Sequence, residues 1–457
     1  MRSILATLAL SALLAACGGK PGPEPAPTAA PAPTAAPAPT ADAAPAPAAD
    51  AAAPAPSADA AAPAPADAAP TATADAAPAP TGPATEVVLW HSYRGKEAEA
   101  LDQVVKSFNE SGAGVTIRSQ QIPYDPFVDK VTITVPAGTG PDLFIFAHNM
   151  VGNWVEKGVL EPLSGLVPPE LLKEHMPESV KALVYRKNLY GLPLAFKSLV
   201  MFYNKKLLPE PPATMEELIP KLQELKTADR YALVYQAGGL YFHSMWFHAF
   251  GGRVFDDEHK PAFDTPEHLK GLEYVRDLHM KHKVLEKGIS GFMVTSLFNE
   301  GNAVVVFNGP WFLAEIEGPV EYGIAPLPTV EGKPLKPMLG IESVFVTKTS
   351  KHKEAALKAA MFLAGAQSAK VRMEVGRQPV THQATLQEGA KTDDQMRVFM
   401  QQFDNSVLMD ASPEMQLLWT PGDNAISAGI FVEDRNPKDE LEKAQQKMVE
   451  AIGAMQK

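Results

Sequence analysis

The sequence predicts an α/β protein whose globular part is divided into two lobes. Segments with the pattern of buried strands alternate with amphipathic helices over about the last 370 residues, and this alternation is typical of α/β architecture. That length exceeds what a single hydrophobic core usually holds. Because ligands of open α/β sheets bind beyond the carboxyl ends of the strands, we expect a cleft between the lobes.

Composition narrows the possible functions. The chain has 457 residues, one cysteine and a formal net charge of -12. An acidic chain without a basic face is not expected to bind nucleic acid, and a single cysteine excludes a disulfide framework. No motif for a metal or a cofactor stands out, so we expect neither.

Residues 1–16 have the features of a secretory signal peptide. An apolar segment at 4–16 follows Met1-Arg2-Ser3 and is too short to span a bilayer. Its end, LAAC at 14–17, resembles the bacterial lipobox, in which the cysteine becomes the lipidated first residue. We therefore expect Cys17 to anchor the protein in the cell envelope, on the outer side of the cytoplasmic membrane or in the periplasm.

The segment up to residue 85 is predicted to be a disordered tether. It consists almost entirely of Ala, Pro, Thr and Asp, with APAPT recurring. Such a composition has too little apolar bulk to offset the entropy of ordering, and its prolines favour extended conformations. Residues 17–85 would thus hold the globular part away from the membrane.

The globular part begins with a predicted β-α-β unit. EVVLW at 86–90 has the pattern of a short strand, AEALDQVVKSF at 98–108 that of a helix, and GVTIRSQ at 114–120 alternates as a strand does. A further apolar strand is predicted in PDLFIFAH at 141–148. These elements would form the sheet of the first lobe.

The run AVVVF at 303–307 predicts a strand that is buried on both faces. Asn308-Gly309 ends it, and Pro310 has the fixed φ that suits the first turn of a helix. Trp311 would then lie at the carboxyl end of a strand, where a ligand cleft is expected. Packing between elements is the alternative role for this indole.

Two later helices are predicted near the end of the chain. EAALKAAMFLAG should form a helix that ends near Gly365. The last helix should begin at Asn436 and Pro437, a suitable N-cap and first residue. Its apolar face is expected to carry Leu441, Ala444, Met448, Ile452 and Met455.

Four segments resemble the maltodextrin-binding protein and its relatives, a sugar-binding family of extracellular solute-binding proteins that serve ABC importers. They are GPDLFIFAHNMVGNWVEKGVLEPL, LVMFYNKKLLPEPPATMEEL, FNEGNAVVVFNGPWFLAEI and YGIAPLPTVEGKPLKPMLG, in this order. The resemblance extends from about residue 86 to the C-terminus. It implies the type II periplasmic-binding-protein fold, with two discontinuous lobes joined by hinge strands. The expected lobes are 86–195 with 344–382, and 198–340 with 385–457.

The resemblance also implies a function. We expect a protein that captures an α-glucoside such as maltose, a maltodextrin or trehalose, closes its lobes and delivers the sugar to ABC permease subunits. It would act as a monomer held by its lipid anchor. A binder of another oligosaccharide or of an amino-acid-like solute is one alternative. A glycoside-acting enzyme and a purely structural envelope protein are two others.

A sugar ring has an apolar face and a rim of hydroxyls, so its site needs aromatic platforms and polar partners. By resemblance the platforms are Phe146, Tyr241, Trp311 and Trp419. Phe146 replaces a tryptophan of the family pattern. Two further indoles, Trp154 and Trp246, are expected in the core.

The expected polar partners depart from the family pattern. Tyr93 and Arg94 stand where the family has an Asp-Lys pair, and Asn149 stands where it has the first residue of an Asp-Arg pair. Lys197 replaces a glutamate. Our hypothesis is that Arg94, Asn149 and Lys197 bind sugar hydroxyls through a rearranged set of hydrogen bonds; surface or interlobe roles are the alternative.

The enzyme alternative requires two carboxylates that flank the scissile bond. Pairs such as Glu97 with Glu99 are interpreted as solvated charges on a helix. Motifs for a serine or cysteine nucleophile are absent from the sequence. We therefore expect no enzymatic activity.

Overall fold

The computed structural model describes residues 84–456, which belong to one compact unit. The predictions for the signal peptide, Cys17 and the tether lie outside these residues. Within the described part, no helix is both long and apolar enough to cross a membrane.

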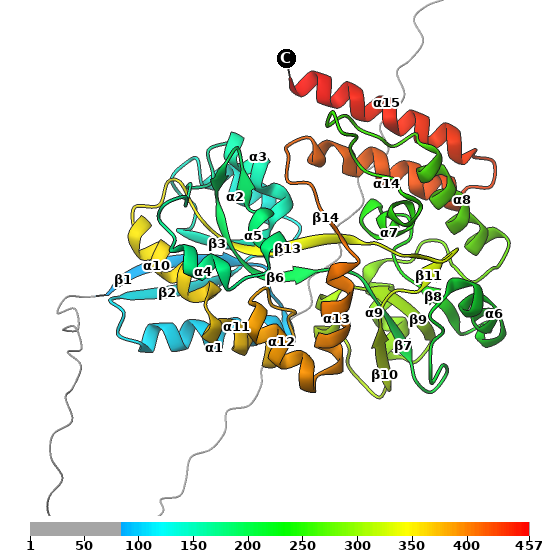
Figure 1. Ribbon diagram of the computed structural model, residues 1–457, viewed down its shortest axis with the longest axis horizontal. Coiled ribbons are helices and arrows are strands. Elements are labelled where there is room, and N and C mark those ends of the chain that lie inside the picture. Colours follow the sequence, from blue (N-terminus) through cyan, green and yellow to red (C-terminus); the bar gives the residue numbers. More distant parts are fainter. Residues whose placement is uncertain (1–83, 457) are drawn as a thin grey trace, which may run out of the picture. The chain divides into compact units, whose positions relative to one another are not determined.

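The first sheet has six strands and is built from distant parts of the chain (Figure 1). Its members are β1 Thr85–His91, β2 Val115–Gln121, β3 Leu143–Ala147, β6 Gly191–Lys197, β13 Met338–Val346 and β14 Val407–Leu408. Strands β1, β2 and β3 are parallel, whereas β13 runs antiparallel to β3 and β6. The sheet is therefore mixed.

The second sheet has four strands in the order β10-β7-β9-β8. They are β7 Val200–Asn204, β8 Tyr231–Val234, β9 Ala303–Asn308 and β10 Tyr322–Ala325. Every residue of β9 is buried, as predicted for the AVVVF run. Two small ribbons pair β4 Val184–Tyr185 with β5 Asn188–Leu189, and β11 Thr329–Val330 with β12 Lys333–Pro334.

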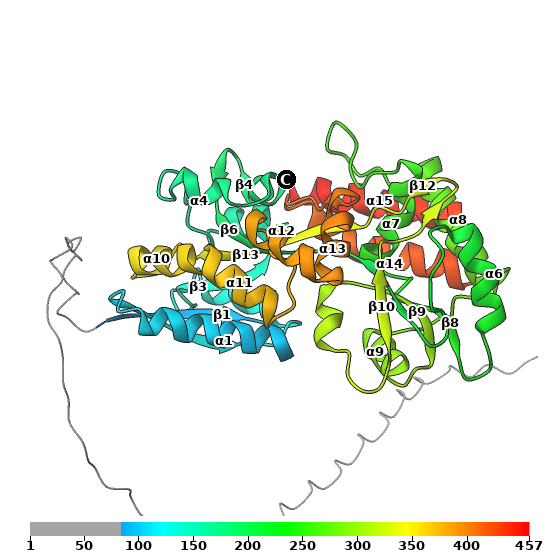
Figure 2. The ribbon, with the colours of Figure 1, turned by 60° about the horizontal axis from the view of Figure 1, so that its bottom comes forward.

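Helices pack around both sheets (Figures 1 and 2). Those between or after strands of the first sheet are α1 Gly95–Glu110, α2 Phe127–Thr134, α3 Val151–Glu156, α4 Pro169–Lys173, α5 Pro177–Lys181, α10 Lys353–Ala364, α11 Ala366–Glu374, α12 Gln383–Thr392 and α13 Asp394–Asp404. The others are α6 Met215–Leu225, α7 Leu240–Phe250, α8 Pro266–Met280, α9 Gly291–Asn299, α14 Met415–Phe431 and α15 Pro437–Met455, with short 3-10 helices η1 His148–Met150 and η2 Pro310–Ala314. Helices α14 and α15 lie side by side and contact each other.

The chain passes from the first sheet to the second directly after β6, and it returns through β13. The lobe boundary predicted at 340–344 falls inside β13, which continues unbroken from Met338 to Val346. Its first two residues pair with β14, and its remainder pairs with β6 and β3. The exact lobe limits stay a prediction. The chain crosses between the two sheets after β6 and again before β13.

The two C-terminal predictions are confirmed with one correction. Helix α10 ends at Ala364, and Gly365 follows as its C-cap. Helix α15 begins at Pro437 with the Asn436 side chain accepting a hydrogen bond from a backbone amide of its first turn. Met455, predicted to lie on the buried face, is 43% exposed because it ends the helix beyond the core.

His148 in η1 is hydrogen-bonded to β13 and to the segment that follows β14. Its Nδ1 accepts a hydrogen bond of 2.9 Å from the Ile341 amide on β13, and its Nε2 donates one of 2.9 Å to the Met409 carbonyl. The accepting Nδ1 requires the neutral ring. Protonation therefore breaks the hydrogen bond from the Ile341 amide. Burial lowers the pKa of His148 to about 4.

This pKa predicts a pH-dependent contribution to stability. An unfolded histidine titrates near pH 6.5, so between about pH 6.5 and about pH 4 the unfolded chain takes up a proton that folded His148 does not. The free energy of unfolding should therefore fall on acidification, by about 1.4 kcal/mol per pH unit for this group.

Urea unfolding of the wild type and of His148→Gln between pH 7 and pH 4 isolates this contribution from the other buried histidines. The wild type should be the more stable at pH 7, and its advantage should shrink as the pH falls. An advantage that does not change with pH would contradict the assignment.

Candidate functional site

Helix α7 follows β8 in the chain, and its first turn contains Tyr241 and Phe242. Gly239 precedes the helix and offers no side-chain cap. Instead, the Asp423 carboxylate on α14 accepts a hydrogen bond of 2.6 Å from the Leu240 amide. A carboxylate at a helix N-terminus is stabilised by the helix dipole, so this hydrogen bond fixes the start of α7 against α14.

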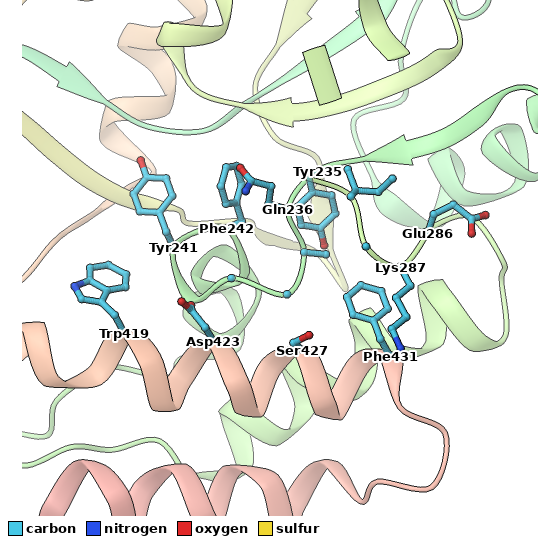
Figure 3. Close-up of a pocket in the computed structure, with 15 residues that line it drawn as sticks. Tyr235, Gln236, Tyr241, Phe242, Glu286, Lys287, Trp419, Asp423, Ser427 and Phe431 are labelled. Atoms are coloured by element: carbon cyan, nitrogen blue, oxygen red, sulfur yellow. The ribbon is translucent and has the colours of Figure 1, made fainter. Parts of the chain in front are cut away.

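A pocket of about 420 Å³ lies between α7, α14 and the loop at 286–289. Figure 3 shows Trp419, Asp423 and Ser427 along one face of α14, facing Tyr241 and Gln236. Residues four apart lie on the same side of a helix, which explains this row. The pocket therefore has aromatic faces at one end and polar groups along its wall.

Trp311 extends this aromatic surface. Its ring centre lies 6.2 Å from that of Tyr241, with the two planes at 51°. The indole covers Gly309, where an added Cβ would come within 2.1 Å of the ring. Pro310 starts a 3-10 helix, not the α-helix that a proline there favours. Half-buried Trp311 also packs against two core clusters, which is the packing role considered for it; its role in binding a ligand stays a prediction.

Phe146, the predicted platform of the first lobe, is covered. It is 6% exposed and is stacked against Phe127 and Tyr124 at ring distances of 5.1 and 5.3 Å. Tyr124 is 61% exposed and presents the outer face of this stack. Trp154 is fully buried against Phe146, as expected for a core indole, and Trp246 is also fully buried.

Tyr124 and Tyr241 lie near each other although they come from different parts of the chain. Burial raises the pKa of the Tyr241 hydroxyl, and the Tyr124 hydroxyl adds to that rise. The pKa of the Tyr124 hydroxyl is raised as well, by the protein atoms packed around it and to a smaller extent by the Glu342 carboxylate, although 61% of the residue is exposed. The hydroxyl of Tyr124 thus acts on that of Tyr241 although the two residues belong to different lobes.

Lys197 occupies a buried charge cluster at the end of β6. Its Nζ lies 2.6 Å from Glu97 Oε1 and 3.3 Å from Glu342 Oε2. Tyr93 donates a hydrogen bond of 2.8 Å to Glu342 Oε2, and Gln378 donates one of 3.0 Å to Glu97 Oε1. The interpretation of Glu97 as a solvated helix charge is wrong: it is 9% exposed because Lys197 pairs with it.

The pKa values show how strongly these charges depend on each other. Burial alone would lower the pKa of Lys197, but the Glu342 and Glu97 carboxylates outweigh it and raise that pKa. Burial raises the pKa of Glu342 despite the opposing effect of Lys197. Lys197 is therefore a stably charged centre between two carboxylates.

Of the remaining predicted polar residues, Tyr93 belongs to the Lys197 cluster, whereas Arg94 and Asn149 make other contacts. Arg94 is exposed and pairs with Glu315 after η2 at 3.4 Å, a contact between the two lobes. Tyr93 is buried, and its hydroxyl is directed to Glu342 rather than left open. The Asn149 carbonyl accepts a hydrogen bond of 2.9 Å from Gln416 on α14.

Sequence reasoning missed four residues around the predicted site. Phe242 and Asp423 line the pocket, Tyr124 covers Phe146, and Glu342 pairs with Lys197. A signal existed for two of them. Glu342 is a lone charge in the apolar run MLGIESVFV, and Tyr124 is an aromatic residue between a strand and a proline-bounded turn. Among the described residues, no group of three or more His, Cys, Asp or Glu is placed to hold a metal ion.

Residues 94–370 match the family of bacterial extracellular solute-binding proteins. This chain belongs to that family. The fold agrees, because the structure superimposes on that of the Thermus thermophilus maltotriose-binding protein bound with maltotriose with a TM-score of 0.74. The two are 28% identical, and the match covers 80% of this chain and all of the Thermus protein. The predicted type II periplasmic-binding fold is thereby confirmed.

Two curated relatives show the range of ligands among similar proteins. A maltotriose-binding protein of Pyrococcus abyssi is 29% identical over 73% of this chain and 75% of its own length. A galactooligosaccharide-binding protein of Bacillus subtilis is 26% identical over 79% of this chain and 88% of its own length. Oligosaccharides are the common element of these names.

Proposed function

We propose that this solute-binding protein captures a maltooligosaccharide or a related α-glucoside for an ABC importer. The observation that carries the proposal is the pair of aromatic faces, Tyr241 and Trp419, at one end of a pocket with a polar wall. Flat apolar rings beside hydrogen-bonding groups match the two kinds of surface on a pyranose. The similarity to two maltotriose-binding proteins supports this sugar class.

Binding proceeds by closure of the lobes. Tyr124 and the charge cluster of Lys197 come from the first lobe, and Tyr241, Trp311 and Trp419 come from the second. A sugar that contacts both sets favours the closed arrangement over an open one. The exposed Arg94–Glu315 pair adds an interlobe contact, although an ion pair so open to solvent contributes only about 0–1 kcal/mol.

The remaining parts of the proposal concern location and partners. A lipid on Cys17 would tether the protein in the cell envelope as a monomer, and the closed form would dock on permease subunits. No chemical step is proposed. The two carboxylates of the Lys197 cluster, Glu97 and Glu342, share one lysine and do not form a free acid and base pair as glycoside hydrolysis requires.

Calorimetric titration with maltose, maltotriose, maltotetraose and trehalose tests the proposal. We expect saturable heat with one site per chain for at least one of them, and recovery of the sugar unchanged. Saturation only by a galactooligosaccharide would favour the second candidate, which the Bacillus subtilis relative supports. No heat with any α-glucoside, in protein shown to be folded, would contradict the function.

Gly309→Ala should weaken sugar binding without touching the sugar. The added Cβ would lie 2.1 Å from the Trp311 ring, so the indole must move away from its position beside Tyr241. We expect the affinity for maltotriose to fall about tenfold, since displacing one aromatic face removes roughly 1–1.5 kcal/mol of apolar burial.

Gly453→Ala is a suitable control, because a Cβ there meets no atom within 4 Å. Calorimetry should show wild-type affinity for the control. Wild-type affinity in Gly309→Ala as well would contradict a role for the Trp311 position.

A further inference from the structure

The carboxylate of Glu342 has two oxygen atoms in different surroundings. Oε2 accepts a hydrogen bond from Tyr93 and pairs with Lys197. Within the described part of the chain, Oε1 accepts no hydrogen bond. It is also not one of the fully buried polar atoms that lack a partner, and the side chain is 14% exposed. Oε1 is therefore an unused acceptor that solvent reaches.

Glu342 also lies where the cleft is expected to hold a ligand. On β13 it is paired in register with Ala147, the residue after Phe146 on β3. The Tyr124 ring stacks on Phe146, and the Glu342 carboxylate and the Lys197 ammonium both act on the Tyr124 hydroxyl. The free oxygen and the exposed aromatic face of the first lobe thus lie close together.

The other carboxylate of the cluster is turned toward the interior. Glu97 Oε1 accepts hydrogen bonds from Lys197 and from fully buried Gln378, and Glu97 Oε2, like Glu342 Oε1, accepts no hydrogen bond within the described part of the chain. Glu97 therefore supports Lys197 from behind. The two carboxylates resemble each other in chemistry and burial, yet they differ in the side of the cluster that they occupy.

We infer that Glu342 determines sugar specificity by accepting a hydrogen bond from a sugar hydroxyl on its Oε1. The inference rests on the proposed function. It gives Glu342 the role of binding a sugar hydroxyl that was expected of Lys197. Lys197 and Tyr93 act through Glu342: both hold Oε2, which fixes the direction of Oε1, and both favour the charged form of the carboxylate against the effect of burial. A charged acceptor binds a hydroxyl more strongly than a neutral one.

Glu342→Gln tests this with little change in shape. The amide oxygen can take the place of Oε2 and accept from Tyr93 and Lys197, which leaves an NH2 group in the place of Oε1. The acceptor then becomes a donor. We expect the affinity for maltotriose to fall about 10- to 100-fold, as for loss of a hydrogen bond to a charged group. Glu99→Gln on α1 removes the same charge from an exposed side chain outside the cluster, and its affinity should change less than about threefold.

A panel of monodeoxy maltotriose derivatives distinguishes binding from structural support. Wild type should bind one derivative weakly, and for that derivative Glu342→Gln should cause no further loss. An equal loss for every sugar, or an equal loss in Glu99→Gln, would overturn the inference, as would wild-type affinity in Glu342→Gln. If the wild type itself binds no α-glucoside, the proposed function fails first and the inference falls with it. Urea unfolding of both variants verifies that each is folded.

Discussion

Replacing Lys197 with methionine should lower the free energy of unfolding by about 3–5 kcal/mol, as expected when one partner of a buried ion pair is removed. The lysine separates Glu97 and Glu342, and all three side chains are less than 15% exposed. Methionine fills a similar volume without charge. Two carboxylates would then face each other without a cation, and urea unfolding at pH 7 measures the cost.

The loss should depend on pH in a defined direction. Without Lys197 no cation opposes the effect of burial on Glu342, so the pKa of Glu342 in the folded protein rises further and the folded protein prefers the neutral form. The destabilisation is then fully present at pH 7 and decreases as the pH falls toward 4. Lys96→Met is the matched control, because its partner Glu99 is exposed and the expected change is below about 1 kcal/mol. A change as small in Lys197→Met would contradict the account of the cluster.

Trp419→Ala should reduce the affinity for maltotriose by about 10- to 100-fold. The indole projects from α14 into the pocket beside Tyr241, and it is only partly buried against the core of the second lobe. Removing an aromatic face that a sugar covers costs about 1.5–3 kcal/mol, and each 1.4 kcal/mol corresponds to a factor of ten. Calorimetry gives the affinity, and the unfolding midpoint gives the effect on stability.

Trp419→Phe provides the control for this second prediction. A phenyl ring keeps a flat apolar face and should retain most of the affinity, within about tenfold of the wild type. If Trp419→Ala binds maltotriose as the wild type does, the α14 face is not part of the site. A large loss of stability with unchanged affinity would assign the indole to the core.

The elements predicted best are those whose sequence pattern is local. The N-cap of Asn436 and the spacing of Leu441, Ala444 and Met448 determine α15 within the segment itself. The β-branched run of β9 likewise indicates a strand buried on both faces. In contrast, the direction of β13 depends on its neighbours β3 and β6, which are far away in sequence. Local patterns contain no information about that pairing.

The candidate site divides in the same way. Tyr241, Trp311 and Trp419 were predicted by resemblance, and the structure brings the first two together and places Trp419 in the same pocket as Tyr241. Lys197 was expected to bind hydroxyls because its position differs from the family pattern. Its partners Glu97 and Glu342 come from α1 and β13, 100 and 145 residues away, so only the fold shows that its charge is already neutralised.

A crystal structure of the protein with maltotriose would locate the sugar on the chain. We expect a sugar between the lobes, with pyranose faces against Trp419 and Tyr241 and one hydroxyl within hydrogen-bond distance of Glu342 Oε1. Maltotriose bound elsewhere on the chain, or rings that contact neither aromatic face, would contradict the assignment of this cleft as the sugar site.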